Sequence, residues 1–194
     1  KNSHPIEQAA MNPAEVSQLF DAISYSKGAS VIRMLENFLG EETFRKGLNR
    51  YLFGHMYDNA RTQDLLPALE TESGQPVTAI MDSWVKQMGY PVLQVESDRS
   101  GAKTQLSVSQ ERFVYDSLLG DSEPDAEVWR VPISASQGGE ESPITVMEGN
   151  QTQIEVPGNS DSWVKLNPLQ TGFFRVNYSA EDWQRLVPAI ESLE

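Results

Sequence analysis

Residues 20–35 read Phe20-Asp21-Ala22-Ile23-Ser24-Tyr25-Ser26-Lys27-Gly28-Ala29-Ser30-Val31-Ile32-Arg33-Met34-Leu35. This stretch and the residues after it have the spacing of an amphipathic helix, in which one apolar face is shared by Ile23, Ile32, Leu35, Phe38 and Leu39. Gly28 leaves room beside that helix for another backbone or a ligand. The amphipathic pattern does not require Tyr25 or Lys27, so these two polar residues need another explanation.

The neighbouring sequence predicts a helical region over residues 1–90. Asn12-Pro13-Ala14-Glu15 is typical of a helix start, and Gly40 is expected to end the helix that carries Tyr25. Glu41-Glu42 favour the start of a further helix that ends at Gly54.

Two more helices are predicted before residue 90. Thr62 is expected to cap the first, with Pro67 in its first turn or at a kink. After Gly74-Gln75-Pro76, the second places one apolar stripe toward the core, formed by Val77, Ile80, Met81 and Trp84. We expect this tryptophan, Trp129 and Trp163 to be core residues rather than ligand platforms.

Beyond Pro91 the hydrophobic period changes to two, which is typical of strands. Seven short runs fit this pattern: 92–96, 104–109, 128–133, 144–146, 153–156, 163–166 and 173–176. They predict an antiparallel β-sandwich over residues 91–176. Ser179 with Glu181-Asp182 predicts a last helix within residues 177–194, whose apolar side chains Trp183, Leu186, Val187 and Ile190 would face a missing neighbour.

Composition excludes several classes of protein. The 194 residues carry 15 basic and 28 acidic side chains, a net charge of −13, so nucleic acid is not an expected partner. The sequence has no cysteine, which excludes a disulfide framework and favours a cytoplasmic location. No apolar run is long enough to span a membrane. The chain has the character of an excised piece of a longer protein.

Residues able to perform catalysis are few. The only histidines are His4 and His55, no His-Glu-x-x-His pair is present, and we therefore expect no metal site within this chain. Tyr25 is the best catalytic candidate, because a neutral phenol can donate a hydrogen bond to an oxyanion. From the residues alone, the more ordinary interpretation of Tyr25 is packing at the margin of a core.

Several motifs occur in an order that favours the catalytic interpretation of Tyr25 over the packing one. They are Ser3-His4-Pro5-Ile6, the stretch from Phe20 to Ala29, Met34-Leu35 with Gly40, Phe44-x-x-Gly47-Leu48-x-x-Tyr51, Trp84-x-x-Gln87-x-Gly89-Tyr90-Pro91, Trp163-Val164-Lys165-Leu166-Asn167 and Gly172-Phe173-Phe174-Arg175. In this order they closely resemble the zinc aminopeptidases of the puromycin-sensitive aminopeptidase and aminopeptidase N family. The resemblance covers nearly the whole chain.

The resemblance implies an α+β multidomain organisation. Residues 1–90 would form the helical carboxyl-terminal part of a thermolysin-like catalytic domain, residues 91–176 a β-sandwich, and residues 177–194 the first helix of a helical domain. Tyr25 matches the tyrosine that stabilises the transition state in such enzymes. Lys27 also matches the family motif, which assigns it no role, and from the residues alone it is expected to be a solvated charge.

The same resemblance implies that the parent protein is a zinc metallo-aminopeptidase acting on peptides with a free amino terminus. The zinc ligands and the general base would lie upstream of this chain, so the chain alone is expected to hold no catalytic zinc and to be inactive. Self-association through the surface that the rest of the catalytic domain would cover is a further expectation.

A different class of function is a non-catalytic binding module, in which the helices form a scaffold and the β-sandwich recognises a partner. The two hypotheses differ in the surroundings of Tyr25. The enzyme hypothesis expects an exposed hydroxyl, whereas the scaffold hypothesis expects a buried one with its hydrogen bonds satisfied.

Overall fold

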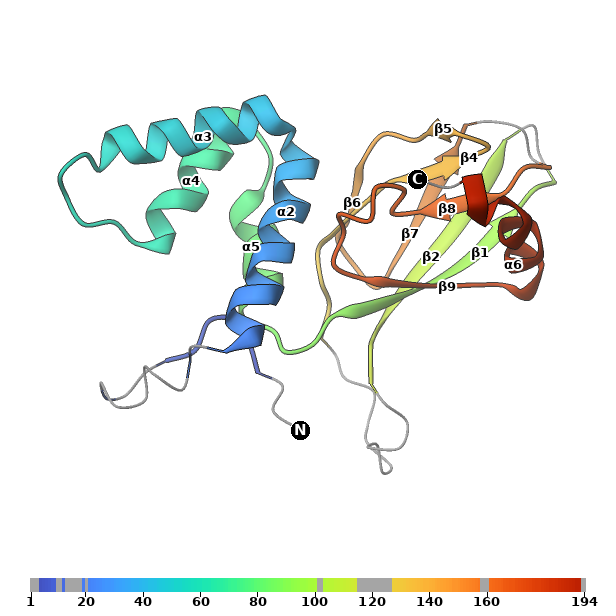
Figure 1. The fold of residues 1–194 in the computed structure, drawn as a ribbon, viewed down its shortest axis with the longest axis horizontal. Helices are drawn as coiled ribbons and strands as arrows, with labels where there is room; N and C mark the ends of the chain where they lie inside the picture. Colours follow the sequence, from blue (N-terminus) through green and yellow to red (C-terminus); the bar gives the residue numbers. More distant parts are fainter. Residues whose placement is uncertain are drawn as a thin grey trace. The chain divides into compact units, whose positions relative to one another are not determined.

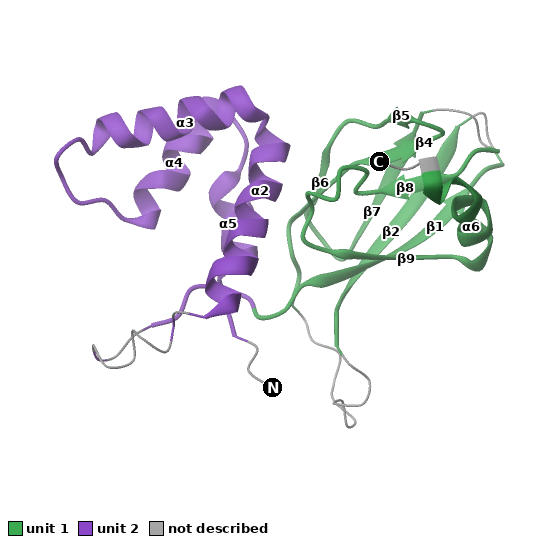
Figure 2. Ribbon diagram, in the orientation of Figure 1, with its two compact units in different colours: residues 1–3, 88–194 green, residues 4–87 purple. Residues whose placement is uncertain are grey.

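The computed structural model describes residues 4–9, 12, 19, 21–100, 103–114, 127–157 and 161–192. The chain divides into two compact units, one of residues 4–87 and the other of residues 88–194 (Figure 2). The first is helical and the second contains the sheets (Figure 1). A mixed α+β fold is therefore confirmed. The helix predicted to start at Asn12-Pro13 falls largely on residues 13–18, which lie outside the described residues.

The helical unit begins, within its described part, with a π-helical turn, η1 (Ile23–Lys27), that runs directly into α2 (Gly28–Leu39). It continues with α3 (Glu41–Gly54), α4 (Thr62–Ser73) and α5 (Val77–Val85). Gly40 ends α2 with φ 80° and Gly74 ends α4 with φ 65°. Both are conformations that glycine adopts readily, and both helix ends were predicted.

Two details of the helical prediction are wrong. The buried face of α2 is formed by Val31, Met34 and Leu35, whereas Ile32 is half exposed, so the buried stripe is rotated relative to the predicted one. Thr62 is the first residue of α4 rather than its cap; the cap is Arg61, whose amide donates to the Asp64 carboxylate at 2.7 Å.

Pro67 lies in the middle of α4, so the first-turn position, one of the two alternatives predicted for it, is wrong. The core of this unit gathers apolar side chains from α2, α4 and α5, among them Val31, Leu69, Ile80 and Trp84, each at most 1% exposed. The predicted stripe of α5 is confirmed, since Val77, Ile80, Met81 and Trp84 are all buried.

The glycine of the motif Phe44-x-x-Gly47-Leu48-x-x-Tyr51 is required by close packing between two helices. A β-carbon at this position of α3 would lie 3.0 Å from the α-carbon of Leu69 in α4 and closer still to its side chain. No larger residue fits without movement of one helix. By contrast, a β-carbon at Gly28 would meet nothing within 4 Å, so open space adjoins the start of α2.

The second unit holds nine strands in the part of the chain that the structure describes: β1 (Pro91–Asp98), β2 (Thr104–Arg112), β3 (Val131–Ile133), β4 (Ala135–Gln137), β5 (Glu140–Glu141), β6 (Thr145–Met147), β7 (Gln151–Val156), β8 (Val164–Leu166) and β9 (Arg175–Tyr178). One sheet has the order β7-β2-β1-β9, a second pairs β3 with β6, and a third has the order β5-β4-β8. Trp129 is fully buried, as predicted, whereas Trp163 is only partly buried.

The sheets correct the predicted sandwich in four ways. Strands β4 and β5 were not predicted, residues 128–130 are not part of a strand, and β9 begins at Arg175 rather than at Phe173. The pairing is also not wholly antiparallel, because β9 runs parallel to β1 with Val92 opposite Arg175. The other strand pairs are antiparallel.

The last helical segment comprises α6 (Ala180–Leu186) and the 3₁₀ turn η3 (Val187–Ser192). The Ser179 hydroxyl accepts the Asp182 amide at 3.1 Å, which confirms the predicted helix start. The expectation that all its apolar residues face a missing neighbour is wrong for Leu186, which is buried within this unit. Trp183, Val187 and Ile190 remain between 41% and 55% exposed.

A buried ion pair attaches α6 to the sheet. The Asp182 carboxylate is 2% exposed and accepts hydrogen bonds from the Ser97 hydroxyl at 2.7 Å and from Arg99 Nη2 at 2.9 Å. Burial opposes its ionisation, but hydrogen bonds from Ser97, Arg99 and Ser179 outweigh this and hold the pKa of Asp182 below its ordinary value. The carboxylate therefore stays charged inside the unit.

Candidate functional site

Tyr25 lies within the π-helical turn, and its side chain belongs to the exposed surface, with 62% of the residue accessible. Wide helical turns of this kind are rare and are frequent at functional sites. The turn is fixed at its amino end by Asp21, whose carboxylate accepts the amides of Ile23 at 3.0 Å and Ser24 at 2.9 Å. The backbone of Tyr25 is thus held while its ring faces solvent.

His4 belongs to the supports of this turn. Its Nε2 lies 2.7 Å from Asp21 Oδ2, and its Nδ1 lies 2.6 Å from the Pro5 carbonyl oxygen. The hydrogen bond to Pro5 and the Asp21 carboxylate raise the pKa of His4. The Ser24 amide and then His4 lower the pKa of Asp21. His4 therefore hydrogen-bonds both within its own loop and to the residue that begins the turn.

Lys27 differs from the solvated charge that its sequence context suggests. The residue is only 7% exposed, and its Nζ donates a hydrogen bond of 3.0 Å to the carbonyl oxygen of Gln87. That carbonyl follows the last turn of α5, near the negative end of the helix dipole. The ammonium group thus ties the turn that carries Tyr25 to the carboxyl end of α5.

No group of three or more histidine, aspartate or glutamate side chains that could hold a metal ion occurs among the described residues. The residues present therefore do not fit a zinc site by themselves. None of the helices in the described part of the chain combines the length and the apolar character needed to cross a bilayer.

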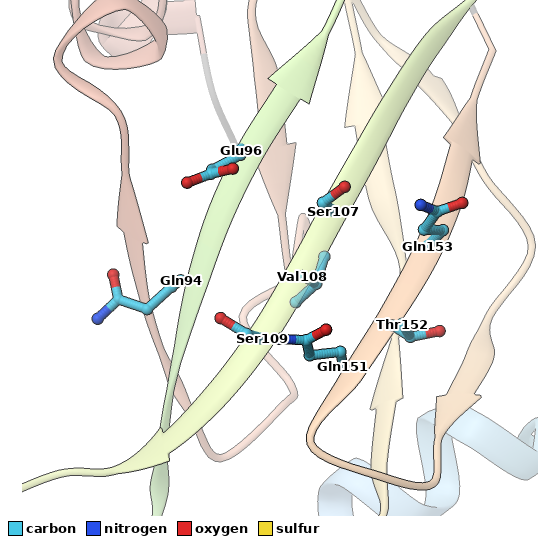
Figure 3. Close-up of a pocket in the computed structure, with 8 residues that line it drawn as sticks. All are labelled: Gln94, Glu96, Ser107, Val108, Ser109, Gln151, Thr152 and Gln153. Carbon is cyan, nitrogen blue, oxygen red and sulfur yellow. The ribbon is translucent and has the colours of Figure 1, made fainter.

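A second candidate surface lies on the exposed face of the four-stranded sheet. A hollow of about 440 Å³ follows β2, where the small side chains Ser107 and Ser109 lie between longer ones on β1 and β7 (Figure 3). The flanking side chains are Gln94, Glu96, Gln151 and Gln153. This surface offers hydroxyl and amide groups for hydrogen bonds.

The remaining motifs have structural explanations in the second unit. The Asn167 side chain pairs with both the amide and the carbonyl of Gly172, at 2.9 and 3.0 Å, which closes the loop between β8 and β9. The guanidinium of Arg175 lies 4.7 Å from the ring centre of Phe113, which stacks on Tyr90. These motif residues build the fold rather than a reactive site.

Comparison with known proteins finds a matching family model and similar aminopeptidases. Residues 1–84 match the model of the peptidase family M1 domain. The chain is 41% identical over 196 residues to a puromycin-sensitive aminopeptidase of Caenorhabditis elegans, with 99% of this chain and 20% of that protein covered. It is 37% identical to the glutamyl aminopeptidase of Rattus norvegicus, with 98% and 20% covered.

An archaeal protein is similar to the same degree. The tricorn protease-interacting factor F2 of Thermoplasma volcanium is 38% identical over 191 residues, which cover 98% of this chain and 22% of that protein. The chain belongs to peptidase family M1. It spans about a fifth of the length of the curated relatives that it matches.

Lys27 is the residue whose environment the sequence analysis did not predict. Lysine is seldom buried, so neither composition nor hydrophobic period signals its position. The spacing from Tyr25 holds a usable signal, because side chains two positions apart on a helix do not share a face. An exposed Tyr25 therefore requires Lys27 to lie toward the other side of the helix.

Proposed function

We propose that the parent protein is a zinc metallo-aminopeptidase that removes amino-terminal residues from peptides, and that Tyr25 contributes directly to catalysis. The exposure of Tyr25 on a fixed helical turn is the observation that carries this proposal. A phenol in that position donates a hydrogen bond to the carbonyl oxygen of the scissile peptide bond as negative charge develops on it. Membership of peptidase family M1 supports the reaction class.

Zinc, its ligands and the general base come, in this proposal, from parts of the parent protein beyond the described residues. The helical unit is then the carboxyl-terminal part of the thermolysin-like catalytic domain, and the sheets form the following β-sandwich. Residues 177–194 would begin the next, helical domain. The isolated chain is expected to show no peptidase activity and to bind no stoichiometric zinc.

The substitution Tyr25→Phe in the full-length parent tests the catalytic role. Loss of one oxyanion donor typically lowers kcat by about 10²–10³-fold. Tyr57→Phe is the matched control, because Tyr57 is an exposed tyrosine elsewhere in the helical unit. The proposal expects a strong loss for the first variant and turnover within about twofold of the parent for the second, as for an ordinary surface change. Equal turnover in both variants would remove Tyr25 from the reaction.

The polar hollow on the sheet favours a second candidate function, a binding module in which the sandwich recognises a polar partner. The arginine of a Ser107→Arg variant would fill the hollow between its flanking strands. Under the aminopeptidase proposal this change leaves kcat and KM of the parent unaltered. Under the binding-module hypothesis it abolishes capture of the partner while Tyr25→Phe has no effect.

A further inference from the structure

We infer that Lys27 is a positioning residue for Tyr25, which fixes the direction of the phenol by holding the opposite side of the same helical turn. The inference rests on the proposed catalytic role of Tyr25. Its starting observation is a contrast in exposure between two residues of the same turn: Tyr25 is 62% exposed, whereas Lys27 is 7% exposed.

The geometry of a helix connects these two side chains. Residues two positions apart point about 200° from one another around an α-helix, and a π-helical turn changes this angle only modestly. Tyr25 and Lys27 lie in the same turn, η1, and so project to opposite sides of it. Any rotation of the turn about its axis that moved Lys27 would move the phenol by a similar angle.

The contact of Lys27 resists such a rotation. Its Nζ donates to the Gln87 carbonyl oxygen at 3.0 Å, and Gln87 is sixty residues further along the chain. This carbonyl follows α5, whose Ile80 and Trp84 are fully buried in the core of the unit. The hydrogen bond of the lysine therefore fixes the position of the turn relative to α5, a helix that is anchored in the core of the unit.

Stability alone gives no reason for a lysine at this position. Removing an ammonium group from water costs free energy, and an apolar side chain of similar length would join the two helices without that cost. A hydrogen bond differs from an apolar contact in being directional, so it restricts rotation as well as separation. Precise direction matters for an oxyanion donor, because small misplacements lower turnover sharply.

Asp21 fixes the other end of the turn. Its carboxylate accepts two amides at the amino end, and the Tyr25 amide donates to the Asp21 carbonyl oxygen at 3.2 Å. Asp21 thus holds the amino end of the turn by accepting its backbone amides. Lys27 holds the other end through its buried side chain. Lys27 connects the turn to the carbonyl that follows α5.

The test is a double-substitution cycle in the full-length parent enzyme, with Lys27→Met and Tyr25→Phe made singly and together. Lys27→Met keeps the apolar stem and removes the donor. We expect its kcat to fall about 10–100-fold with KM little changed, because the phenol is misdirected rather than lost. In the Tyr25→Phe background the same change is expected to lower the residual kcat less than twofold, because no phenol remains to be positioned.

Lys46→Met is the matched control, since Lys46 lies on α3 with 57% of its side chain exposed, and its kcat should equal that of the parent. If Lys27→Met lowers kcat equally in both backgrounds, or leaves it unchanged while Tyr25→Phe is impaired, the positioning role is wrong and the catalytic role of Tyr25 stands. Full turnover in Tyr25→Phe overturns both roles.

Should Lys27→Met prevent folding, Lys27→Gln keeps a neutral donor on a shorter stem and replaces it in the cycle. A loss of kcat confined to the background that retains Tyr25 again supports the positioning role. A loss of equal size in both backgrounds contradicts it.

Discussion

The helical unit and the sheet unit place tyrosines in opposite environments. Tyr25 of the helical unit is exposed on a π-helical turn. Tyr178 of the sheet unit is partly buried, its hydroxyl accepts the Leu166 amide at 2.8 Å, and burial raises its pKa to about 12. The same side chain thus supports the fold in one unit and is exposed to solvent in the other. Surroundings, not residue type, distinguish a tyrosine that supports the fold from the one proposed to act in catalysis.

The two units also differ in what their buried charged residues do. In the sheet unit the buried carboxylate of Asp182 joins β1 to α6 through Ser97 and Arg99, and its purpose is to hold two elements together. In the helical unit the buried ammonium of Lys27 holds the turn that presents Tyr25. Breaking these two contacts should therefore affect different properties.

The largest change in stability is expected from Asp182→Ala. This variant leaves the Arg99 guanidinium, whose side chain is 13% exposed, without its carboxylate. Loss of one partner of a buried ion pair typically costs about 3–5 kcal/mol. Chemical denaturation of the 194-residue chain, followed by a probe in the sheet unit, should show this loss. Glu181→Ala is the control, because the Glu181 side chain is 73% exposed and pairs with Arg185 only at the surface. A similar loss in both variants would contradict the account.

The same carboxylate predicts a dependence on pH. The folded pKa of Asp182 is lowered, so its contribution to stability is complete above the unfolded pKa of about 3.9 and disappears as the pH falls through the folded value. The free energy of unfolding of the sheet unit should fall on acidification below about pH 4. In Asp182→Asn this part of the fall should be absent. Parallel curves for the two proteins would exclude Asp182 as the cause.

Two glycines of the helical unit sharpen the comparison between packed and open surfaces. Gly47→Ala forces a β-carbon against Leu69 and is expected to destabilise the unit by about 1–3 kcal/mol. Gly28→Ala meets no neighbour and lies in a helix, so a gain of about 0.5–1 kcal/mol is expected. Thermal unfolding of both variants checks this difference in sign. Destabilisation by Gly28→Ala would show that the open space is filled.

The sequence predicted the helices better than the sheets because helix ends carry local signals. Gly40 and Gly74 adopt positive φ values where the helices stop, and Pro76 comes just before α5. The phase of α2 was wrong because Val31 and Ile32 are equally apolar, and only tertiary packing decides which of two adjacent residues is buried.

Strands were harder for physical reasons. β4 reads Ala135-Ser136-Gln137 and β5 has only two residues, so neither has an apolar alternation to detect. The amide nitrogen of buried Gln137 instead donates to the Thr104 hydroxyl at 2.9 Å. The parallel pairing of β9 with β1 joins residues about eighty positions apart, and no local signal specifies it.

For the candidate site, the sequence identified Tyr25 but not the support beneath it. Tyr25 was found through a motif, whereas the burial of Lys27 depends on the position of the Gln87 carbonyl after a distant helix. A long-range contact of this kind leaves no trace in composition or periodicity. Only the two-residue spacing holds a signal, because it places Lys27 on the side of the helix away from Tyr25.

The central claim is that Tyr25 acts in catalysis while Tyr178 acts in folding, and paired tyrosine-to-phenylalanine variants of the full-length parent test it most directly. Tyr25→Phe should lower kcat about 10²–10³-fold and change the unfolding free energy by less than about 0.5 kcal/mol. Tyr178→Phe should lose about 1–3 kcal/mol of stability, because the Leu166 amide loses its acceptor, and should keep its kcat well below the unfolding temperature. Full turnover in Tyr25→Phe, or a loss of stability in place of activity, would contradict the account.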